Sequence, residues 1–350
     1  MGQATSVRLV LHPALRNGII EKLAARLAEN LPAWGFAADL AEQPSRTAAV
    51  NHWLLYYYGP DARVGPATML VTHIDRPHKL RLLQKRIPFV DVAVCVSRMT
   101  LQQLLDFNVP GSKLTYVTPG CDLRPRPRRT VIALSSRVYP DSRKREHLLV
   151  RLAHAMRLDL FEFVIVGPGW ATIVRELRRA GALVSYHAGG DDFEADYDAA
   201  LDGLSRADYY LYLGLDEGAM GVLDALAAGV ATIVTPQGYH LDLPHGITHS
   251  FVRFRELLAV FEQLAAVRRQ RIDSVRGLTW HEYARQHATL WRAVLAGGRT
   301  DYLRLMHPDA ASGLAPPTAA PWSLVRRWGA FYAREGAYYG RQILRRLTGI

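Results

Sequence analysis

The sequence has little cysteine and no long apolar run. Its two cysteines, Cys95 and Cys121, are too few among 350 residues for a disulfide framework or a cysteine-ligated metal site. That composition fits a protein of the reducing cytoplasm. No apolar run reaches about 18 residues, so no membrane-spanning helix is predicted. No signal peptide is recognised at the start of the sequence.

Acidic residues are outnumbered by basic ones. The chain has 43 Lys and Arg against 32 Asp and Glu, which gives a net charge of +11. Such an excess favours an anionic partner: a nucleotide, a nucleic acid or an acidic membrane surface. The sequence contains no recognised nucleic-acid-binding motif, so we expect no nucleic-acid partner.

Cofactor motifs are also missing. No complete GxGxxG follows the first predicted strand, which argues against dinucleotide binding by the first half, and the GPG that begins at Gly167 is only half of this motif. The spacing of His240, His245 and His249 matches no standard metal-binding helix. We therefore expect neither a metal nor another cofactor.

Strand-like and helix-like runs alternate along the chain. This alternation predicts an α/β protein with two Rossmann-like, doubly wound parallel sheets. The expected organisation is a first domain over 1–123, the linker RPRPRR over 124–129, a second domain over 130–298, and a connector and tail over 299–350. Strands are predicted over 7–11, 52–58, 68–74, 91–97, 114–118, 130–134, 161–167, 183–186, 209–214 and 230–234.

The stretch 211–240 predicts a strand, a loop, a helix and a second strand, and therefore a loop at the carboxyl edge of a sheet. Glu217, Gly221 and Asp224 have the spacing of one helix face. Carboxylates there can accept hydrogen bonds from sugar hydroxyls, and the glycine lets a ligand approach. The amides of Gly218, Ala219 and Met220 can bind a phosphate. The alternative is two solvated acids and a glycine needed for packing.

A basic loop follows the strand at 130–134. Arg137 and Lys144 lie just before a predicted helix, where cations and amides together can hold a diphosphate. Arg143 and Arg145 are interpreted as helix-surface charges. The alternative is that the whole loop is a solvated basic surface.

Two loops of the first half carry weaker candidates. Asn17 is expected to cap a helix over 18–29. Gly18 in the same loop and Gly167 are expected to contribute to donor binding. His73 and Asp75 follow a predicted strand, where a histidine can contact a sugar hydroxyl or a phosphate. A surface histidine is the alternative.

The tail combines arginines with aromatic residues. Residues 322–350 contain six arginines and one glutamate, interleaved with tryptophan, tyrosine and phenylalanine. This pattern favours a helix lying on an anionic bilayer, which places the protein at the inner face of the cell membrane. The alternative is that the helix packs against the first domain.

These motifs resemble GT-B glycosyltransferases of the family 4 type. The frame of that family's donor loop is kept from Val222 to Gly229, with Asp224 in place of its second glutamate. The family's first glutamate falls on Asp216 by alignment, whereas the Glu-Gly pair is shifted to Glu217, so either acid can take its place. Arg137 and Lys144 match the family's diphosphate-binding pair, and Arg145 replaces a glycine.

The resemblance implies a function. It implies two facing domains, with an acceptor held by the first and a nucleoside-diphosphate sugar by the second. It also implies a retaining, metal-independent transfer to a glycan or lipid-linked acceptor in surface polysaccharide synthesis. An epimerase or phosphorylase on the same fold, and a non-catalytic nucleotide-sugar binder, are the alternatives.

Overall fold

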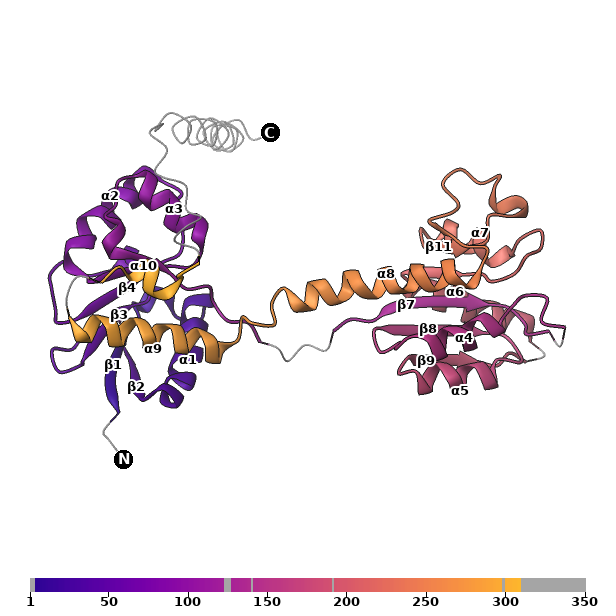
Figure 1. Ribbon diagram of the computed structural model, residues 1–350, viewed down its shortest axis with the longest axis horizontal. Helices are drawn as coiled ribbons and strands as arrows, with labels where there is room; N and C mark the ends of the chain where they lie inside the picture. The colour runs from indigo at the N-terminus through magenta and orange to yellow at the C-terminus, as the bar shows by residue number, and fades with distance from the viewer. Residues whose placement is uncertain (1–3, 123–126, 140, 191, 298–299, 310–350) are drawn as a thin grey trace, which may run out of the picture. The chain divides into compact units, whose positions relative to one another are not determined.

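The chain forms two compact units. The computed structural model describes residues 4–122, 127–139, 141–190, 192–297 and 300–309. Unit 1 combines Met1–Leu123 with Arg276–Ile350, and unit 2 is Arg124–Val275. The expected second domain, 130–298, thus differs from the observed unit, because the chain returns to unit 1 from Arg276 onward (Figure 1). The tail at 322–350 and most of the connector lie outside the described residues.

Unit 1 is built on a six-stranded sheet in the order β2-β1-β3-β4-β5-β6, with every pairing parallel. The helices α1 and α9 cover one face and α2 and α3 cover the other. The strands are β1 (Thr5–Val10), β2 (Phe36–Ala41), β3 (Val50–Trp53), β4 (Ala67–Val71), β5 (Val92–Cys95) and β6 (Leu114–Tyr116). The helices are α1 (Ile19–Asn30), α2 (Pro77–Arg86), α3 (Arg98–Asp106), α9 (Trp280–Ala296) and α10 (Tyr302–Met306).

The central strands of unit 1 are buried throughout because helices cover both faces. Every residue of β3, β4 and β5 is buried, as expected for a parallel sheet between two helical layers. The edge strand β2 has Phe36 as its one buried residue, and this strand was absent from the sequence prediction. Asn17 does not cap α1: Gly18 is the N-cap, and Asn17 adopts a left-handed conformation with φ of 59°.

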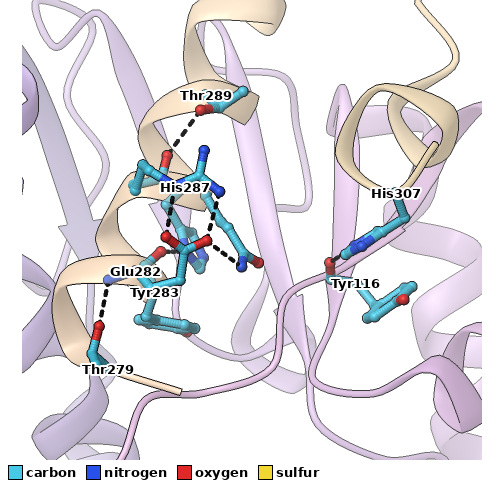
Figure 2. A network of polar contacts seen from close by, with 9 residues as sticks. Tyr116, Thr279, Glu282, Tyr283, His287, Thr289 and His307 are labelled. Atoms are coloured by element: carbon cyan, nitrogen blue, oxygen red, sulfur yellow. Dashed lines mark hydrogen bonds and ion pairs between the residues drawn. The ribbon is translucent and has the colours of Figure 1, made fainter. Parts of the chain in front are cut away.

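Helix α9 joins unit 1 through a buried aromatic face (Figure 2). Tyr283, His287 and Trp291 are spaced four residues apart and are fully or nearly fully buried. The Trp291 indole donates a hydrogen bond to the Thr68 hydroxyl in β4, at 3.1 Å. At the start of the helix, the Thr279 hydroxyl accepts from the Glu282 amide, at 3.0 Å. This packing explains why the chain beyond Arg276 belongs to unit 1 rather than to the second domain.

Unit 2 has a second six-stranded parallel sheet, in the order β12-β11-β10-β7-β8-β9. Its helices α4, α5 and α8 share one core, and α6 and α7 share the other. The strands are β7 (Thr130–Ser135), β8 (Phe161–Val166), β9 (Leu183–His187), β10 (Tyr209–Leu211), β11 (Ala231–Val234) and β12 (His249–Ser250). The helices are α4 (His147–Ala155), α5 (Ala171–Arg179), α6 (Phe193–Arg206), α7 (Met220–Ala227) and α8 (Phe254–Asp273).

The strand orders confirm two Rossmann-like, doubly wound sheets. Unit 2 has the 3-2-1-4-5-6 order of dinucleotide-binding domains, and its strand order reverses between β7 and β10. In unit 1 the reversal falls between β1 and β3. In open parallel sheets, ligands bind at the carboxyl edge where the order reverses. Among the described helices, none is long and apolar enough to cross a membrane.

Candidate functional site

The candidate site in unit 2 lies where the loops after β7 and β10 meet. These strands are parallel neighbours, with Tyr210 opposite Ala133, so their carboxyl ends share one edge. The loop after β7 carries Arg137 and Lys144. The loop after β10 carries Asp216 and Glu217 and leads into α7. Four of the residues singled out in the sequence thus lie on two adjacent loops at the sheet's reversal point.

Lys144 brings a cation to the loop after β10. Its ammonium nitrogen lies 5.5 Å from the centroid of the Tyr212 ring and 5.6 Å from that of Tyr139. A cation at such distances is attracted to the ring faces, which fixes where the half-buried side chain points. Arg137 is exposed in the same loop. Lys144 is therefore a cation held against two rings, and Arg137 is an exposed cation earlier in the same loop.

Arg145 is not the surface charge expected from the sequence. Its Nε donates to the Leu213 carbonyl at 2.7 Å, and its Nη1 to the Val252 carbonyl at 2.6 Å. The residue has φ of 55°, a left-handed conformation that favours glycine. Burial lowers the pKa of its guanidinium. Arg145 therefore ties the loop that carries Lys144 to the loop after β10 and to the start of α8.

The two acids after β10 have different environments. The Tyr212 hydroxyl donates to both carboxylate oxygens of Asp216, at 2.6 and 2.8 Å, and the Gly218 amide donates to one of them at 3.4 Å. Burial, and then the neighbouring Asp216 carboxylate, raises the pKa of Tyr212, so its hydroxyl stays protonated and donates. Glu217 is exposed. Asp216 is held by the protein, whereas Glu217 faces solvent.

The predicted helix face of Glu217, Gly221 and Asp224 does not form. Helix α7 begins at Met220, so Glu217 precedes it. Gly221 is in the helix, but a methyl group there would press on the Tyr210 hydroxyl and lie 2.6 Å from Ser135 Oγ. The packing alternative therefore explains Gly221. Asp224 is on α7, and its carboxylate accepts a hydrogen bond from the Tyr197 hydroxyl, at 3.2 Å.

Two of the three amides expected to bind phosphate already have partners. The Gly218 amide donates to Asp216, and the Ala219 amide donates to Nε2 of the buried His240, at 3.3 Å. His240 Nδ1 lies 3.0 Å from the Thr235 carbonyl, to which it donates while Nε2 accepts from the amide. The amide of Met220 lies in the first turn of α7, where amides have no partner within the helix.

His240 was missed as a site residue in the sequence. It follows β11, the strand next to β10, and therefore comes to the same sheet edge. Its ring also explains Gly218, which has φ of 125°. A Cβ there would lie 2.6 Å from the Tyr239 ring and 3.0 Å from His240 Nε2. The available signal was the sequence position of His240, just after a predicted strand.

Gly167 has a packing role at the same edge. It follows β8, has φ of 124°, and a Cβ would press on the Ser136 carbonyl after β7. The glycine thus lets the loops after β7 and β8 approach each other. A role of Gly167 in donor binding stays a prediction.

Unit 1 has a cavity of about 260 Å³ where its own strand order reverses. His12 follows β1 and Tyr58 follows β3, and their rings stack in parallel with centroids 3.8 Å apart. Glu42 and Asp61 contribute carboxylates to the lining, and they pair with Arg16 at 2.8 Å and Arg86 at 3.6 Å respectively. His12 and Tyr58 had not been singled out in the sequence, although His12 comes directly after a predicted strand.

His73 and Gly18 are not among the residues that line this cavity. The His73 ring is largely exposed and lies 3.9 Å from Asp75, which pairs more closely with Lys79, at 2.6 Å. Gly18 is the extended N-cap of α1. The described residues contain no group of three metal-binding side chains close enough to hold an ion.

Comparisons with known proteins give fold-level similarity. No family model and no curated protein matches the sequence. Among solved structures, one similar chain is the lipopolysaccharide outer core galactosyltransferase WaaB, with 9% identity, a TM-score of 0.32, and 80% of this chain and 97% of that chain covered.

Two further similar structures are also transferases or nucleotide complexes. Anabaena HepE in complex with UDP and glucose has 12% identity and a TM-score of 0.29, over 88% of this chain and 99% of that one. AviGT4, a glycosyltransferase involved in avilamycin A biosynthesis, has 18% identity and a TM-score of 0.30, over 84% and 99%. At these identities and scores, the likeness concerns the fold alone.

Proposed function

We propose that this protein is a glycosyltransferase that moves a sugar from a nucleoside diphosphate to a glycan or lipid-linked acceptor. The observation that carries the proposal is the position of Lys144. Its ammonium is fixed against the Tyr212 ring, at the reversal point of a Rossmann-like sheet, one loop away from the start of α7. A cation and the first-turn amide of Met220 at such a point suit a diphosphate.

In this proposal the basic loop stabilises the leaving group. When the bond between sugar and phosphate breaks, negative charge grows on the nucleoside diphosphate. Lys144, with Arg137 and the Met220 amide, would offset that charge without a metal ion, and such fixed electrostatic stabilisation is a large part of catalysis. The transfer would retain the configuration of the donor sugar, in line with the family that the sequence resembles.

We assign the donor sugar hydroxyls to Glu217 rather than Asp216. Both Asp216 oxygens already accept from Tyr212, whereas the Glu217 side chain is exposed. Asp224 would then bind the nucleotide ribose from α7. Glu217→Gln should weaken turnover more than Asp216→Asn in variants that keep the wild-type melting temperature. The reverse order would exchange the two assignments.

The acceptor would bind unit 1. Its cavity combines the stacked rings of His12 and Tyr58 with the carboxylates of Glu42 and Asp61. Rings that cover sugar faces and carboxylates that accept from hydroxyls suit a carbohydrate. His73 would act at the edge of this region, and the basic aromatic tail at 322–350 would hold the protein at an anionic membrane.

A non-catalytic nucleotide-sugar binder is the second candidate. It is favoured by the Gly218 and Ala219 amides, which donate to protein groups rather than being open to a phosphate. Such a protein would bind a donor without turning it over.

Thermal shift against a panel of nucleoside diphosphates and their sugars tests the proposal. We expect a nucleotide-specific rise in melting temperature that is lost in Lys144→Ala, followed by product formation with a glycan acceptor. Binding without any product would favour the second candidate. No response to any nucleotide would reject both.

A further inference from the structure

A second cavity lies at the opposite edge of the sheet of unit 2. It has a volume of about 400 Å³ and is lined by residues at the amino ends of β7, β10, β11 and β12 and by the last turns of α8. Because the strands are parallel, this edge lies a strand length away from Lys144. The cavity is therefore separate from the candidate donor site.

The lining of this cavity is positively charged. Arg128, Arg268 and Arg271 contribute three guanidinium groups, and Asp208 contributes the single carboxylate. Asp208 is already bonded: it accepts from Arg128 at 2.7 Å and from the Val131 amide at 2.9 Å. One carboxylate cannot balance three guanidinium groups, so the cavity keeps an excess of positive charge.

The arginines differ in how firmly they are held. Arg268 is only 19% exposed, donates to the Thr130 hydroxyl at 3.0 Å and lies 4.0 Å from Asp208. The guanidinium of Arg271 forms no hydrogen bond or ion pair with any residue that the structure describes, and only the backbone carbonyl of this residue accepts, from the Ser274 hydroxyl at 2.7 Å. One guanidinium is thus fixed at the wall of the cavity, while the other is available to a ligand.

Neutral donors complete the lining. The rings of Tyr209 and His249 lie 5.6 Å apart at the wall. Burial, and then the Asp208 carboxylate, raises the pKa of Tyr209, whereas Arg268 and Arg271 oppose this shift. Burial lowers the pKa of His249, so near neutral pH its ring is an uncharged hydrogen-bond donor.

We propose that this cavity binds a phosphate group carried by an organic molecule. Two or more guanidinium groups with neutral donors recognise the oxygens of a phosphate. A cavity of this volume exceeds what a bare phosphate needs and lies in the range of small-ligand sites. The apolar side chains of Leu264 and Val267 would face the organic part.

The test titrates the full chain with glycerol phosphate by calorimetry, and separately with vesicles containing phosphatidic acid, which displays the same group on a lipid. Arg271→Ala is the test variant. Arg269→Ala is its control, because Arg269 is an exposed arginine of α8 that does not line the cavity. Lys144→Ala separates this cavity from phosphate binding at the carboxyl edge.

We expect Arg271→Ala to weaken binding about tenfold while Arg269→Ala and Lys144→Ala leave it unchanged. Binding of glycerol phosphate with this pattern identifies a soluble ligand, and the same pattern with vesicles alone identifies a lipid headgroup. The inference is overturned if neither ligand binds, if both arginine variants weaken binding equally, or if only Lys144→Ala does. The last two outcomes leave the proposed transferase site unaffected.

Discussion

The two sheets each reverse their strand order once, and the side chains at the two reversal points differ in kind. Unit 2 has a fixed cation there, Lys144, beside the first turn of α7. Unit 1 has stacked rings from His12 and Tyr58 and the carboxylates of Glu42 and Asp61. The same topology thus places a cation at one edge and rings with carboxylates at the other, which in our proposal suit a diphosphate and sugar hydroxyls respectively. The fold provides the place, and the loops decide the chemistry.

The largest expected effect concerns the cation of unit 2. Lys144→Ala should lower turnover about a hundredfold to a thousandfold, because the charge on the leaving diphosphate loses its anchored partner. Turnover with a responsive nucleotide sugar and the melting temperature are both measured. Arg143→Ala is the control, since this exposed neighbour pairs with Asp141 in its own loop. Unchanged turnover in Lys144→Ala would mean that the carboxyl edge of unit 2 does not bind the diphosphate through this cation.

The next effect concerns the core of unit 1. Burial lowers the pKa of His287 from 6.5 to about 4. The free energy of unfolding is therefore unaffected by His287 above pH 6.5. It decreases as the pH falls from 6.5 towards 4, because in this range His287 binds a proton in the unfolded chain but not in the folded protein. The loss should be about 3 kcal/mol. Urea unfolding at several pH values measures it.

His287→Gln provides the control for this pH dependence. Its stability should fall less between pH 6.5 and 4 than that of the wild type, since the buried imidazole is gone. Hydrogen exchange of α9, which carries His287 in unit 1, should report the same difference (Figure 2). Parallel pH curves for the two proteins would show that His287 does not titrate in this range.

A third effect concerns the start of α7 in unit 2. Helix propensity alone favours Gly221→Ala by about 1 kcal/mol. The nearby Tyr210 hydroxyl and Ser135 oxygen instead predict a loss of about 1 to 3 kcal/mol from overpacking. Thermal unfolding decides the sign, and Tyr210→Phe should recover part of the loss. Gly190→Ala is the control, because its new methyl would meet nothing closer than 4.0 Å.

The smallest expected effect concerns the backbone conformation of Arg145, the residue after Lys144. Arg145→Ala and Arg145→Gly both remove the bonds to Leu213 and Val252. Only glycine adopts φ of 55° without strain, so Arg145→Gly should be more stable than Arg145→Ala by about 1 kcal/mol. Chemical unfolding of the two variants measures this difference. Equal stability would mean that the loop changes conformation once the guanidinium is lost.

Most central strands were predictable because each forms a short, mainly apolar run that can be recognised in the sequence. The run over 230–234 contains β11, and that over 130–134 contains most of β7, since both are buried on two sides. The edge strand β2 was not predicted, because Phe36 is its single buried residue and no periodic pattern results. An edge strand is defined by its neighbour in the sheet more than by its own sequence.

The sequence predicted which loops form the candidate site, but not which side chains bond to each other within it. The sequence indicated that Lys144 and the acids after β10 come to one sheet edge, because both follow parallel strands. It did not indicate that Asp216 is held by Tyr212 or that His240 accepts from the Ala219 amide. Those pairs join loops distant in sequence, and side-chain geometry decides them.

By itself, the sequence determined the alternation of strands and helices, the parallel sheets that follow from it, and the edge at which the basic and acidic loops meet. Hydrophobic periodicity and strand-to-loop order are local properties, and they suffice for this. Only the tertiary structure decided that α9 belongs to unit 1, that Arg145 is a tether, and that Gly221 is required by Tyr210. Each of these depends on which surfaces pack together, and packing is a property of the folded chain rather than of any single segment.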